Sequence, residues 1–598
     1  MNVSEYIFDY YSKKGIDTVF MVSGGQAMWL DDAVGKNKNY TVICTHHEQS
    51  AAMSSDAYGR IKNKPSITLI TAGPGCMNAI NGVAGAYTDS SPMIVISGQS
   101  NLNCVEYQNN TGIRQYGVQG INIKPIVQSI VKHFVTVDDP QKIEYYLEKA
   151  YREALSGRPG PVWIEVPLNI QSKEINEKFL SKYDENNINQ DSMVSPKQAA
   201  KQFYKKLSES KRPLILVGQG ISLSGSREKF LDFVHYFNIP VVTARLGIDL
   251  INSDDDLYVG RPGNYGERSA NFAIQNSDFI ISIGCRLASS LVGHNPQEFG
   301  KNAYLFVIDI DKKELDKPGP IVDYKADINC YDFFKEVENN RENYEKRNYS
   351  SWVKKCNEWK KKYPVVQKKY RKCNPINSYY FVDRLSKITS KDASILIDTG
   401  SCFHVACQTW KIKKGQNYLT TGGLSSMGYW AAGIGACIAN NRKNTIVLTG
   451  DGSLQMNIQE FATIKYNKLP IKLFILNNNG YLLIRHTQKN FMNSRFVGEG
   501  PDSGVWCPDV AKIAKAYGIK SLKIDSPEEI DYKIKEALEY DGPVICDVVC
   551  DPWQLLIPRI SSEKMPDGTL KSRKYEDMFP YLSESELKDN MKISERKK

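Results

Sequence analysis

Short apolar runs alternate with longer segments of helical character along most of the chain. The runs in the N-terminal part lie at residues 18–22, 42–44, 66–71, 93–97 and 162–166. Further runs lie at residues 214–217, 241–243, 279–283, 305–308, 445–448 and 471–476. Where helical patterns lie between such runs, apolar residues recur three or four positions apart. Strands that alternate with helices predict an α/β fold with mostly parallel sheets covered by helices.

The runs fall into three blocks, which predict three doubly wound, mostly parallel-sheet domains. A length of 598 residues suits about three or four domains. The polar stretch 172–191 is interpreted as a linker, and the charged, Tyr-rich stretch 336–372 as a long helical connector. We therefore expect domains at residues 1–171, 195–335 and 376–550, and a C-terminal tail at 551–598 that lies on the surface. No internal sequence repeat is evident, so a repeat between the blocks would have to be structural.

Composition narrows the class of protein. Apolar residues make up 41% of the chain and charged residues 24%, which is typical of a globular protein. No run of 18 apolar residues exists, and the N-terminal helix lacks the apolar core of a signal peptide. The thirteen cysteines show no CxxC pair, which favours reduced thiols and a cytoplasmic location. The net charge of +10 is spread over many lysines, so we expect neither nucleic acid nor membrane as a partner.

The most specific motif lies between residues 445 and 480. One apolar run ends in Gly-Asp-Gly-Ser at 450–453, a helical segment follows, and the second run ends in Asn-Asn-Asn-Gly at 477–480. Both strand ends of such a unit open on the same edge of a parallel sheet. The oxygens of Asp451 and Asn478 suit Mg²⁺, and the glycines and the helix N-terminus suit a phosphate. An ordinary crossover with a tight turn is the alternative, but the paired motif favours a magnesium–diphosphate site.

This pattern resembles the signature of thiamine-diphosphate enzymes, and the resemblance covers nearly the whole chain. Matching segments also lie at residues 71–99, 157–171, 212–221 and 422–439, and they point to the acetolactate-synthase-like branch. The resemblance implies thiamine diphosphate and Mg²⁺ as cofactors, and decarboxylation of a 2-oxo acid, pyruvate by default. Carboligation to a carbonyl acceptor would follow, either to a second 2-oxo acid or to a nucleotide-linked keto sugar. The alternatives are an ordinary acetolactate synthase, an enzyme that cleaves 1,2-diketones, and an inactive scaffold subunit.

Two catalytic residues follow from the resemblance. Glu48 comes just after a short strand, at the start of an Ala-rich helix. By itself, it could simply interact with the helix dipole. In the family, a carboxyl group here hydrogen-bonds the aminopyrimidine ring and promotes intramolecular removal of the thiazolium C2 proton. Gln119 resembles an active-site glutamine of the same family.

The resemblance also assigns cofactor contacts, with Met427 as the apolar residue that supports a bent cofactor. Asp451, Asn478 and the Gly480 carbonyl would bind the metal. The full set of implied cofactor-binding residues is Gly25, Gln26, Thr399, Gly400, Ser401, Cys402, Phe403, His404, Ser425, Met427, Gly450, Asp451, Gly452, Ser453, Asn478, Gly480, Tyr481 and Leu482. Because the pyrimidine and diphosphate ends bind different chains in this family, we expect a homodimer or a homotetramer.

Several departures set this chain apart from acetolactate synthases. Gly120 replaces a Glu, and Phe403 precedes His404 where the family has a Gln-His pair. Residues 479–498 and 567–582 resemble a subgroup found with polysaccharide and unusual-sugar biosynthesis. Three residues after the metal turn are therefore candidates for an acceptor pocket, with surface salt bridging as the alternative: Arg485, Gln488 and Arg495. Residues 260–288 and 307–315 resemble the flavin-binding region, so FAD is an allowed further cofactor, although residues 287–295 diverge.

Overall fold

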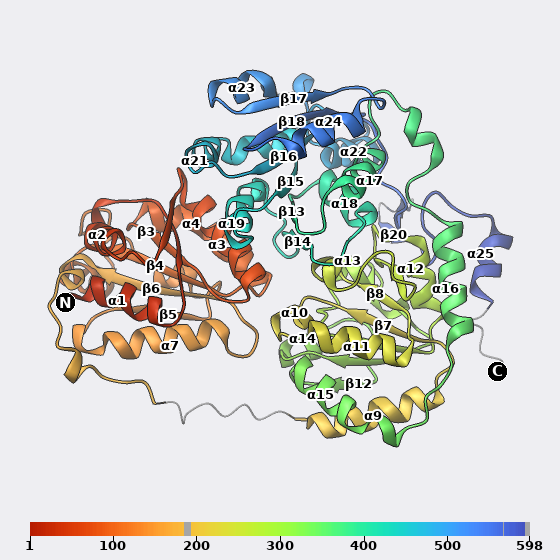
Figure 1. The fold of residues 1–598 in the computed structure, drawn as a ribbon, viewed down its shortest axis with the longest axis horizontal. Coiled ribbons are helices and arrows are strands. Elements are labelled where there is room, and N and C mark those ends of the chain that lie inside the picture. Colours follow the sequence, from red (N-terminus) through yellow and green to blue (C-terminus); the bar gives the residue numbers. More distant parts are fainter. Residues whose placement is uncertain (185–192, 566, 568, 593–598) are drawn as a thin grey trace.

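Three six-stranded parallel sheets form the framework of the protein (Figure 1). The structure is a computed structural model that describes residues 1–184, 193–565, 567 and 569–592. Each sheet has a separate cluster of buried apolar residues on each of its two faces. This arrangement confirms the predicted α/β fold of three doubly wound domains.

The first sheet has the order β2-β1-β3-β4-β6-β5. Its strands are β1 (Thr18–Met21), β2 (Thr41–Cys44), β3 (Ile67–Ile70), β4 (Met93–Gln99), β5 (His133–Thr136) and β6 (Pro161–Pro167). The helices around it are α1 (Val3–Lys13), α2 (Met28–Lys36), α3 (Glu48–Lys62), α4 (Pro74–Thr88), α5 (Leu102–Thr111), α6 (Lys124–Val127), α7 (Ile143–Leu155) and α8 (Leu168–Gln171). All five predicted strands are present. The edge strand β5 was not predicted because its residues are only half-buried and form no continuous apolar run.

The central sheet has the order β12-β11-β10-β7-β8-β9. Its strands are β7 (Pro213–Val217), β8 (Val241–Thr243), β9 (Tyr258–Gly260), β10 (Phe279–Ile283), β11 (Tyr304–Ile308) and β12 (Tyr324–Ala326). The helices are α9 (Pro196–Glu209), α10 (Gly220–Leu223), α11 (Arg227–Phe237), α12 (Arg268–Asn276), α13 (Ser289–Val292), α14 (Lys312–Asp316), α15 (Cys330–Asn340) and α16 (Ser350–Lys362). The four predicted strands are confirmed, and the two edge strands are too short to give a periodic signal.

The third sheet has the order β14-β13-β15-β16-β18-β17. Its strands are β13 (Ser394–Ile397), β14 (Asn417–Thr420), β15 (Thr445–Gly450), β16 (Ile471–Asn477), β17 (Lys520–Ile524) and β18 (Val544–Val549). The helices are α17 (Ser378–Ile388), α18 (Ser401–Thr409), α19 (Gly433–Ala439), α20 (Asp451–Leu454), α21 (Glu460–Tyr466), α22 (Leu482–Phe491), α23 (Val510–Ala516) and α24 (Ile530–Glu539). Counted from the first strand of each domain, this order is the same as in the first sheet. The two outer domains are therefore a structural repeat that the sequence does not reveal.

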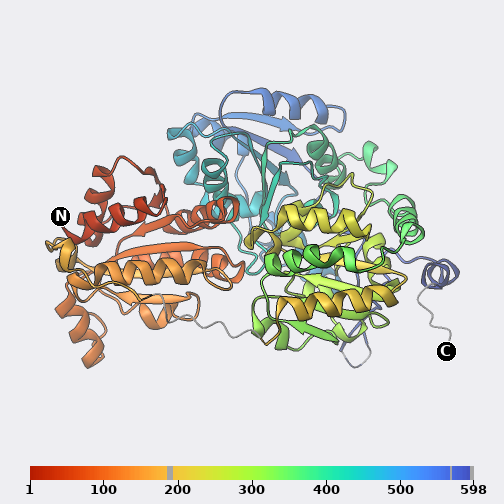
Figure 2. The same cartoon turned by 60° about the horizontal axis from the view of Figure 1, so that its bottom comes forward.

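The three domains pack against one another within one chain. In both views the first domain, red to orange, lies beside the central domain, yellow to green, and the third domain, cyan to blue, adjoins both (Figures 1 and 2). Helices α3 and α19 pack together between the outer domains, and Arg60 Nη1 donates to the Thr420 carbonyl at 2.8 Å. The first and third domains are therefore in direct contact.

The connectors differ from expectation in one respect. Residues 336–372 are not one long helix, because α15 ends at Asn340 and α16 starts at Ser350. The interruption is anchored on the central domain: Tyr344 stacks on Tyr204 at 3.7 Å, and the buried Tyr349 hydroxyl donates to the Leu207 carbonyl. Of the predicted linker 172–191, residues 185–191 lie outside the described residues.

The C-terminal tail crosses the central domain. It contains β19 (Ser562–Lys564), β20 (Leu570–Ser572) and α25 (Glu584–Met591). Tyr575 and Met578 are buried in the central core, and Trp359 Nε1 donates to Asn590 Oδ1 at 2.9 Å. The tail thus stabilises the outer face of the central domain.

Candidate active site

The site is at the switch point of the third sheet. The strand order reverses between β13 and β15, and ligands of open parallel sheets bind outside the carboxyl ends at such a point. Asp398 directly follows β13, and Asp451 directly follows β15. Asn478 follows the neighbouring strand β16. Local strand and turn signals therefore bring the two halves of the sequence motif to one edge.

Two oxygen atoms at this edge are buried without any hydrogen-bond partner. They are Asp451 Oδ1 and Asn478 Oδ1. The other atoms of the two side chains are held: Asp451 Oδ2 accepts from Gly480 N at 2.8 Å, and Asn478 Nδ2 donates to Ser401 Oγ at 3.3 Å. Buried polar atoms without a partner are rare, so an oxygen-preferring cation fits here. Burial raises the pKa of the Asp451 carboxyl to about 6, which a bound dication would reverse.

The turn after β16 is shaped by close backbone contacts. Gly480 has φ +126°, and a Cβ there would lie 2.1 Å from the Glu499 carbonyl oxygen. Tyr481 N donates to the same carbonyl at 2.7 Å, and Leu482, which begins α22, is buried. A Cβ on Gly452 would lie 2.2 Å from the Tyr481 ring, so the packing of this ring requires a residue without a side chain at position 452. Gly450, in contrast, faces open space.

Arg485 holds this turn from behind. Its side chain is only 4% exposed and forms a buried ion pair with Glu499. Nη1 donates to the carbonyls of Asn478 and Pro552, and Nη2 donates to those of Asn479 and Glu499. All five N–H groups of the guanidinium are therefore used within the protein. This placement gives Arg485 no donor for an acceptor molecule, and also differs from a surface salt bridge.

The other two candidate acceptor residues lie farther out. The Gln488 amide is occupied on both sides by Val497, with Nε2 donating to its carbonyl and Oε1 accepting from its N–H. Arg495 is exposed in the loop after α22. Neither side chain is brought to Asp451 by a contact within the described residues.

Asp398 is a buried site residue that the motif analysis missed. It accepts hydrogen bonds from Thr449 Oγ1 at 2.7 Å, Ser453 Oγ at 2.6 Å and Thr399 N at 2.8 Å. Ser453 Oγ also accepts from Gly428 N at 2.8 Å, so the Ser453 side chain links Asp398 to the backbone at Gly428. Burial raises the pKa of Asp398 to about 6. Its position directly before Thr-Gly at the end of an apolar run was the available sequence signal.

Residues 399–404 divide between two neighbourhoods. Thr399, Gly400 and Ser401 lie at the N-terminus of α18 beside the Asn478 side chain. The buried Cys402 thiol donates to the Thr399 carbonyl at 2.8 Å. Phe403 and His404 instead face the central domain, where the guanidinium of Arg245 lies 4.8 Å from the Phe403 ring centre.

His404 packs against a central-domain ring as well. Its imidazole lies 4.1 Å from the Tyr265 ring, centre to centre, and its Nδ1 is buried without a partner. Burial, followed by the charge of Arg245, lowers the pKa of His404 to about 3. This histidine is therefore neutral at physiological pH.

The loop before Met427 is tied to the first domain. Asp89 accepts hydrogen bonds from the N–H groups of Gly422 and Gly423, at 2.8 and 2.7 Å. Ser425 is exposed, with φ +56°, and Met427 is half-buried. A first-domain carboxylate thus sets the path of the segment that carries Met427.

In the first domain, Glu48 begins α3 and is 8% exposed. Its Oε2 accepts from Asn78 Nδ2 at 3.0 Å. Gln119 is exposed, but its backbone lies against Gly73, at the start of α4. The described contacts of these side chains remain within the first domain.

Gly25 and Gln26 lie in the loop after β1, at the switch point of the first sheet between β1 and β3. Gly25 faces open space, and Gln26 N donates to Thr71 Oγ1 at 3.2 Å. The Gln26 carbonyl accepts from Gln171 Nε2 at 2.7 Å. These contacts fix the loop at a ligand-binding position of the sheet.

A three-domain α/β chain with an oxygen-rich site at a switch point is typical of a cofactor-dependent enzyme. Comparison with family descriptions specifies it further. The thiamine pyrophosphate enzyme N-terminal TPP binding domain matches residues 1–137, the central domain matches 200–333, and the C-terminal TPP binding domain matches 398–548.

Individual proteins of similar sequence indicate the same family. A probable acetolactate synthase large subunit of Methanococcus aeolicus is 31% identical, with 93% of each chain covered. An acetolactate synthase large subunit of Cyanidium caldarium is also 31% identical, over 93% of this chain and 94% of its own. One from Lactococcus lactis is 30% identical, with the same coverage. The chain belongs to the thiamine pyrophosphate enzyme family, in its acetolactate-synthase-like branch.

Two observations on the described residues complete the picture. No helix there has the length and apolar character needed to cross a membrane. No cluster of three or more His, Cys, Asp or Glu side chains suited to a metal occurs in the same part of the chain.

Proposed function

We propose that this enzyme decarboxylates a 2-oxo acid, pyruvate by default, and joins the remaining acyl unit to a carbonyl acceptor. Such an enzyme is a lyase or a transferase. The observation that carries the proposal is the pair of partnerless buried oxygens, Asp451 Oδ1 and Asn478 Oδ1, at the switch point of the third sheet. When bound, thiamine diphosphate supplies an electron sink for cleavage of the bond next to the carbonyl group.

The chain's own residues fit this cofactor with Mg²⁺. Asp451 and Asn478 would bind the metal together with the Gly480 carbonyl, because hard oxygens suit Mg²⁺. The N-terminus of α18 would face the diphosphate and favour its negative charge. Replacement of Asp451 by Ala removes the anionic ligand. We expect cofactor affinity to fall at least 100-fold in calorimetry, whereas an unchanged affinity would refute the metal assignment.

Glu48 is the proposed acid–base residue. Asn78 fixes one of its carboxylate oxygens, which leaves the other to hold a proton at the aminopyrimidine ring. Glu48→Gln keeps the shape but removes the acid, so it should retain cofactor binding and lose most C2 proton exchange. Isotope exchange at C2 of the bound cofactor is the measurement, and near-normal exchange would rule out this role.

We also propose that the active enzyme is at least a homodimer, with Glu48 of one chain facing the metal site of another. Exposed apolar side chains support a partner surface on both sides: Met28 and Met77 in the first domain, Ile484 and Trp506 in the third. Light scattering of the active holoenzyme tests this, and a fully active monomer would contradict it. A cytoplasmic location is proposed because all thirteen cysteines are free.

FAD is proposed only as an additional ligand of the central domain. A cavity there lies at the switch point between β7 and β10, and Asp309 follows the adjacent strand β11. Burial raises the pKa of Asp309 to about 6, and its carboxylate suits a ribose hydroxyl. The absorbance spectrum of the purified protein tests for flavin.

The acceptor distinguishes the remaining alternatives. Relatives named acetolactate synthase favour a second 2-oxo acid. The resemblance of residues 479–498 to the unusual-sugar subgroup favours a nucleotide-linked keto sugar. Cleavage of a 1,2-diketone is the third alternative. Mass spectrometry of products from pyruvate with each candidate acceptor decides among them, and absence of CO₂ release from any 2-oxo acid would overturn the proposed function.

A further inference from the structure

The cavity of the central domain reaches the loop that leads to Ser425 and Met427, because Gly422 is one of its lining residues. It has a volume of about 290 Å³ and is lined by the carboxyl ends of β7, β8, β10 and β11. First-domain residues 88–90 and 157–159 form the opposite wall, and Gly422 of the third domain closes one side. All three domains therefore contribute to a single cavity.

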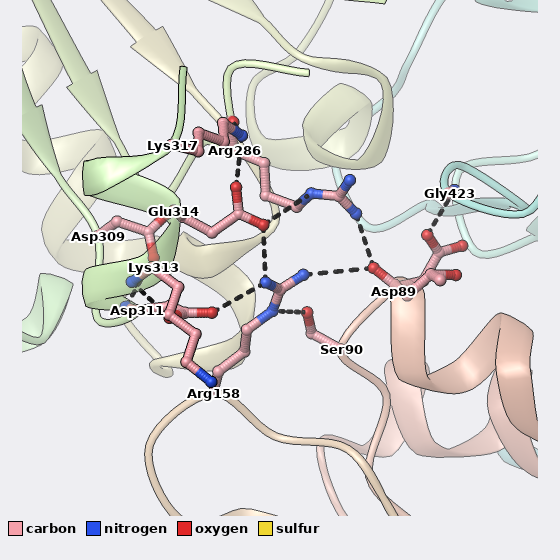
Figure 3. A network of polar contacts seen from close by, with 11 residues as sticks. Asp89, Ser90, Arg158, Arg286, Asp309, Asp311, Lys313, Glu314, Lys317 and Gly423 are labelled. Atoms are coloured by element: carbon pink, nitrogen blue, oxygen red, sulfur yellow. Dashed lines mark hydrogen bonds and ion pairs between the residues drawn. The ribbon is translucent and has the colours of Figure 1, made fainter. Parts of the chain in front are cut away.

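Most cations in this cavity already have protein partners (Figure 3). Arg158 pairs with Asp311 at 3.1 Å and with Glu314 at 2.8 Å. Arg286 donates to the Thr88 carbonyl at 2.7 Å and lies 3.4 Å from the Glu314 carboxylate, which also pairs with Lys317. These contacts join the first and central domains, and each of these cations has at least one protein carboxylate beside it.

Arg245 is different. It follows β8, lines the cavity and is partly exposed to it. Within the described part of the chain it forms no hydrogen bond and no ion pair, and its only polar contact is with the Phe403 ring. Removing a guanidinium from bulk water without pairing it with an anion costs free energy, and contact with the face of an aromatic ring offsets only part of that cost. The side chain is therefore arranged for an anion that the protein does not supply.

The position of Arg245 connects the cavity with the active site. Phe403 is part of the loop at 399–404, and a Cβ on Gly422 would lie 2.8 Å from the side chain of Leu246. Residues 245 and 246 thus lie between the two loops implied to hold thiamine diphosphate. A ligand group on Arg245 would therefore lie beside both loops.

We propose that Arg245 binds an oxyanion of the carbonyl acceptor. This inference rests on the proposed function and identifies Arg245 as the residue that selects acidic acceptors. A guanidinium can hold a carboxylate or a phosphate with two parallel hydrogen bonds. Arg245 follows β8, and Asp309 follows β11, three strand spacings away, or about 14 Å. A small acceptor on Arg245 therefore leaves the Asp309 end open for a nucleotide.

The test uses the full-length holoenzyme with thiamine diphosphate and Mg²⁺. Arg245→Leu, Arg245→Lys and wild type are compared for CO₂ release from pyruvate in a single turnover, for coupled product from pyruvate alone at steady state, and for binding of UDP as a phosphate-bearing probe. We expect CO₂ release within about twofold of wild type in the Leu variant. Either the KM for pyruvate as acceptor rises at least tenfold, or UDP binding weakens at least tenfold. Because Lys cannot reproduce the fork, Arg245→Lys should recover only part of the loss.

The acceptor KM and the UDP binding measurements show whether the oxyanion belongs to a 2-oxo acid or to a phosphate-bearing acceptor. A change in the acceptor KM alone identifies a 2-oxo acid, and a change in UDP binding alone identifies a phosphate-bearing acceptor. Arg158→Leu is the matched control, because it removes a guanidinium from the same cavity whose partners are all protein groups. It should lower the melting temperature and leave both acceptor readouts unchanged.

Three results would overturn the inference. Parallel loss of CO₂ release and coupling would assign Arg245 to the donor or to the fold. Unchanged acceptor KM and unchanged UDP binding would leave it without a ligand role. Release of a bound flavin from Arg245→Leu would assign it to a resident cofactor. Wild-type enzyme without CO₂ release would refute the proposed function instead, while the UDP arm would still test Arg245.

Discussion

Two inward-facing arginines of this protein are in opposite states. Arg485, behind the metal turn, pairs with Glu499 and donates to four backbone carbonyls. Arg245, at the edge of the central cavity, donates to no protein group within the described residues. Both guanidinium groups lie close to loops implied to hold the cofactor. Proximity therefore does not distinguish a structural arginine from a ligand-binding one, but the count of free donors does.

The same criterion applies to oxygens. Arg485, its ion-pair partner Glu499 and the four carbonyls to which Arg485 donates are called the Arg485 clasp below. The Glu499 carboxylate is paired within this clasp, whereas Asp451 and Asn478 each leave one buried oxygen without a partner. At this sheet edge the satisfied atoms hold the fold, and the two atoms that are left over are suited to a ligand. The predictions below test this distinction in four places, from the largest expected effect to the smallest.

Arg485→Met should have the largest effect on stability. It leaves Glu499 buried and unpaired and frees carbonyls at the metal turn, which costs about 3–5 kcal/mol. Because Asn478 and Asn479 lose their donors, Mg²⁺-dependent cofactor affinity should fall as well. Urea denaturation and calorimetry are the measurements.

Arg384→Met is the matched control in the same domain. Arg384 also forms a two-point pair, with Asp531 at 2.7 and 2.6 Å, but this pair is exposed to solvent. Its loss should cost at most about 1 kcal/mol and leave cofactor affinity unchanged. Equal stability losses in the two variants would show that the Arg485 clasp is not a special structural element.

Glu499→Gln should have an intermediate effect. The amide keeps the shape of the side chain, and Arg485 retains its bonds to carbonyls, so the lost charge should cost about 2 kcal/mol. A double-mutant cycle with Arg485→Met separates the pair from its surroundings. A coupling energy near zero would mean that the carbonyl contacts, and not the ion pair, hold the turn.

Sequence patterns identified the parts of this site that depend on neighbours in the chain. Asp451 and Asn478 each follow an apolar run directly, so strand and turn signals were sufficient to place them at one sheet edge. The Arg485 clasp joins residues 478, 479, 499 and 552, and no local pattern reports such a closure. From its position just after the metal turn, Arg485 was therefore predicted to be a candidate contact of the acceptor. Arg245 lacks a motif, and only its surroundings reveal it.

The domain framework was predictable for a similar reason. Buried parallel strands give continuous apolar runs, and all of the predicted strands are present. The half-buried edge strand β5 and the three-residue strands β9 and β12 carry too little apolar sequence to be detected. The repeat between the outer domains is visible only in the strand order, because parallel packing constrains the pattern of apolar residues and not their identity.

His404 tests the surroundings of Arg245 through pH. The pKa of His404 is about 3 in the folded protein and near 6.5 when unfolded, because burial and then Arg245 disfavour its charged form. Below pH 6.5 the unfolded state binds the proton and the folded state does not, so stability falls as the pH drops toward 3. His404→Gln should remove this contribution, with a relative gain of up to about 2 kcal/mol at pH 5 and none at pH 7.5. Urea denaturation at both pH values measures it, and an equal change at both would contradict the assignment.

Arg245→Met in the absence of ligands should have the smallest effect and is the most informative test of the comparison. It removes a desolvated charge that has no counter-ion and loses only the contact with Phe403, so stability should stay within about 1 kcal/mol of wild type. Arg261→Met is the control, since the Arg261 guanidinium is buried and donates to the carbonyls of Cys407 and Trp410, both at 2.7 Å. That variant should lose at least about 2 kcal/mol, because two buried carbonyls lose their donors. Addition of UDP should then raise the melting temperature of wild type and not that of Arg245→Met if the bound oxyanion is a phosphate. A loss of more than about 2 kcal/mol in ligand-free Arg245→Met would instead place Arg245 with Arg485 among the structural arginines, because only an unused guanidinium can be removed without cost to the fold.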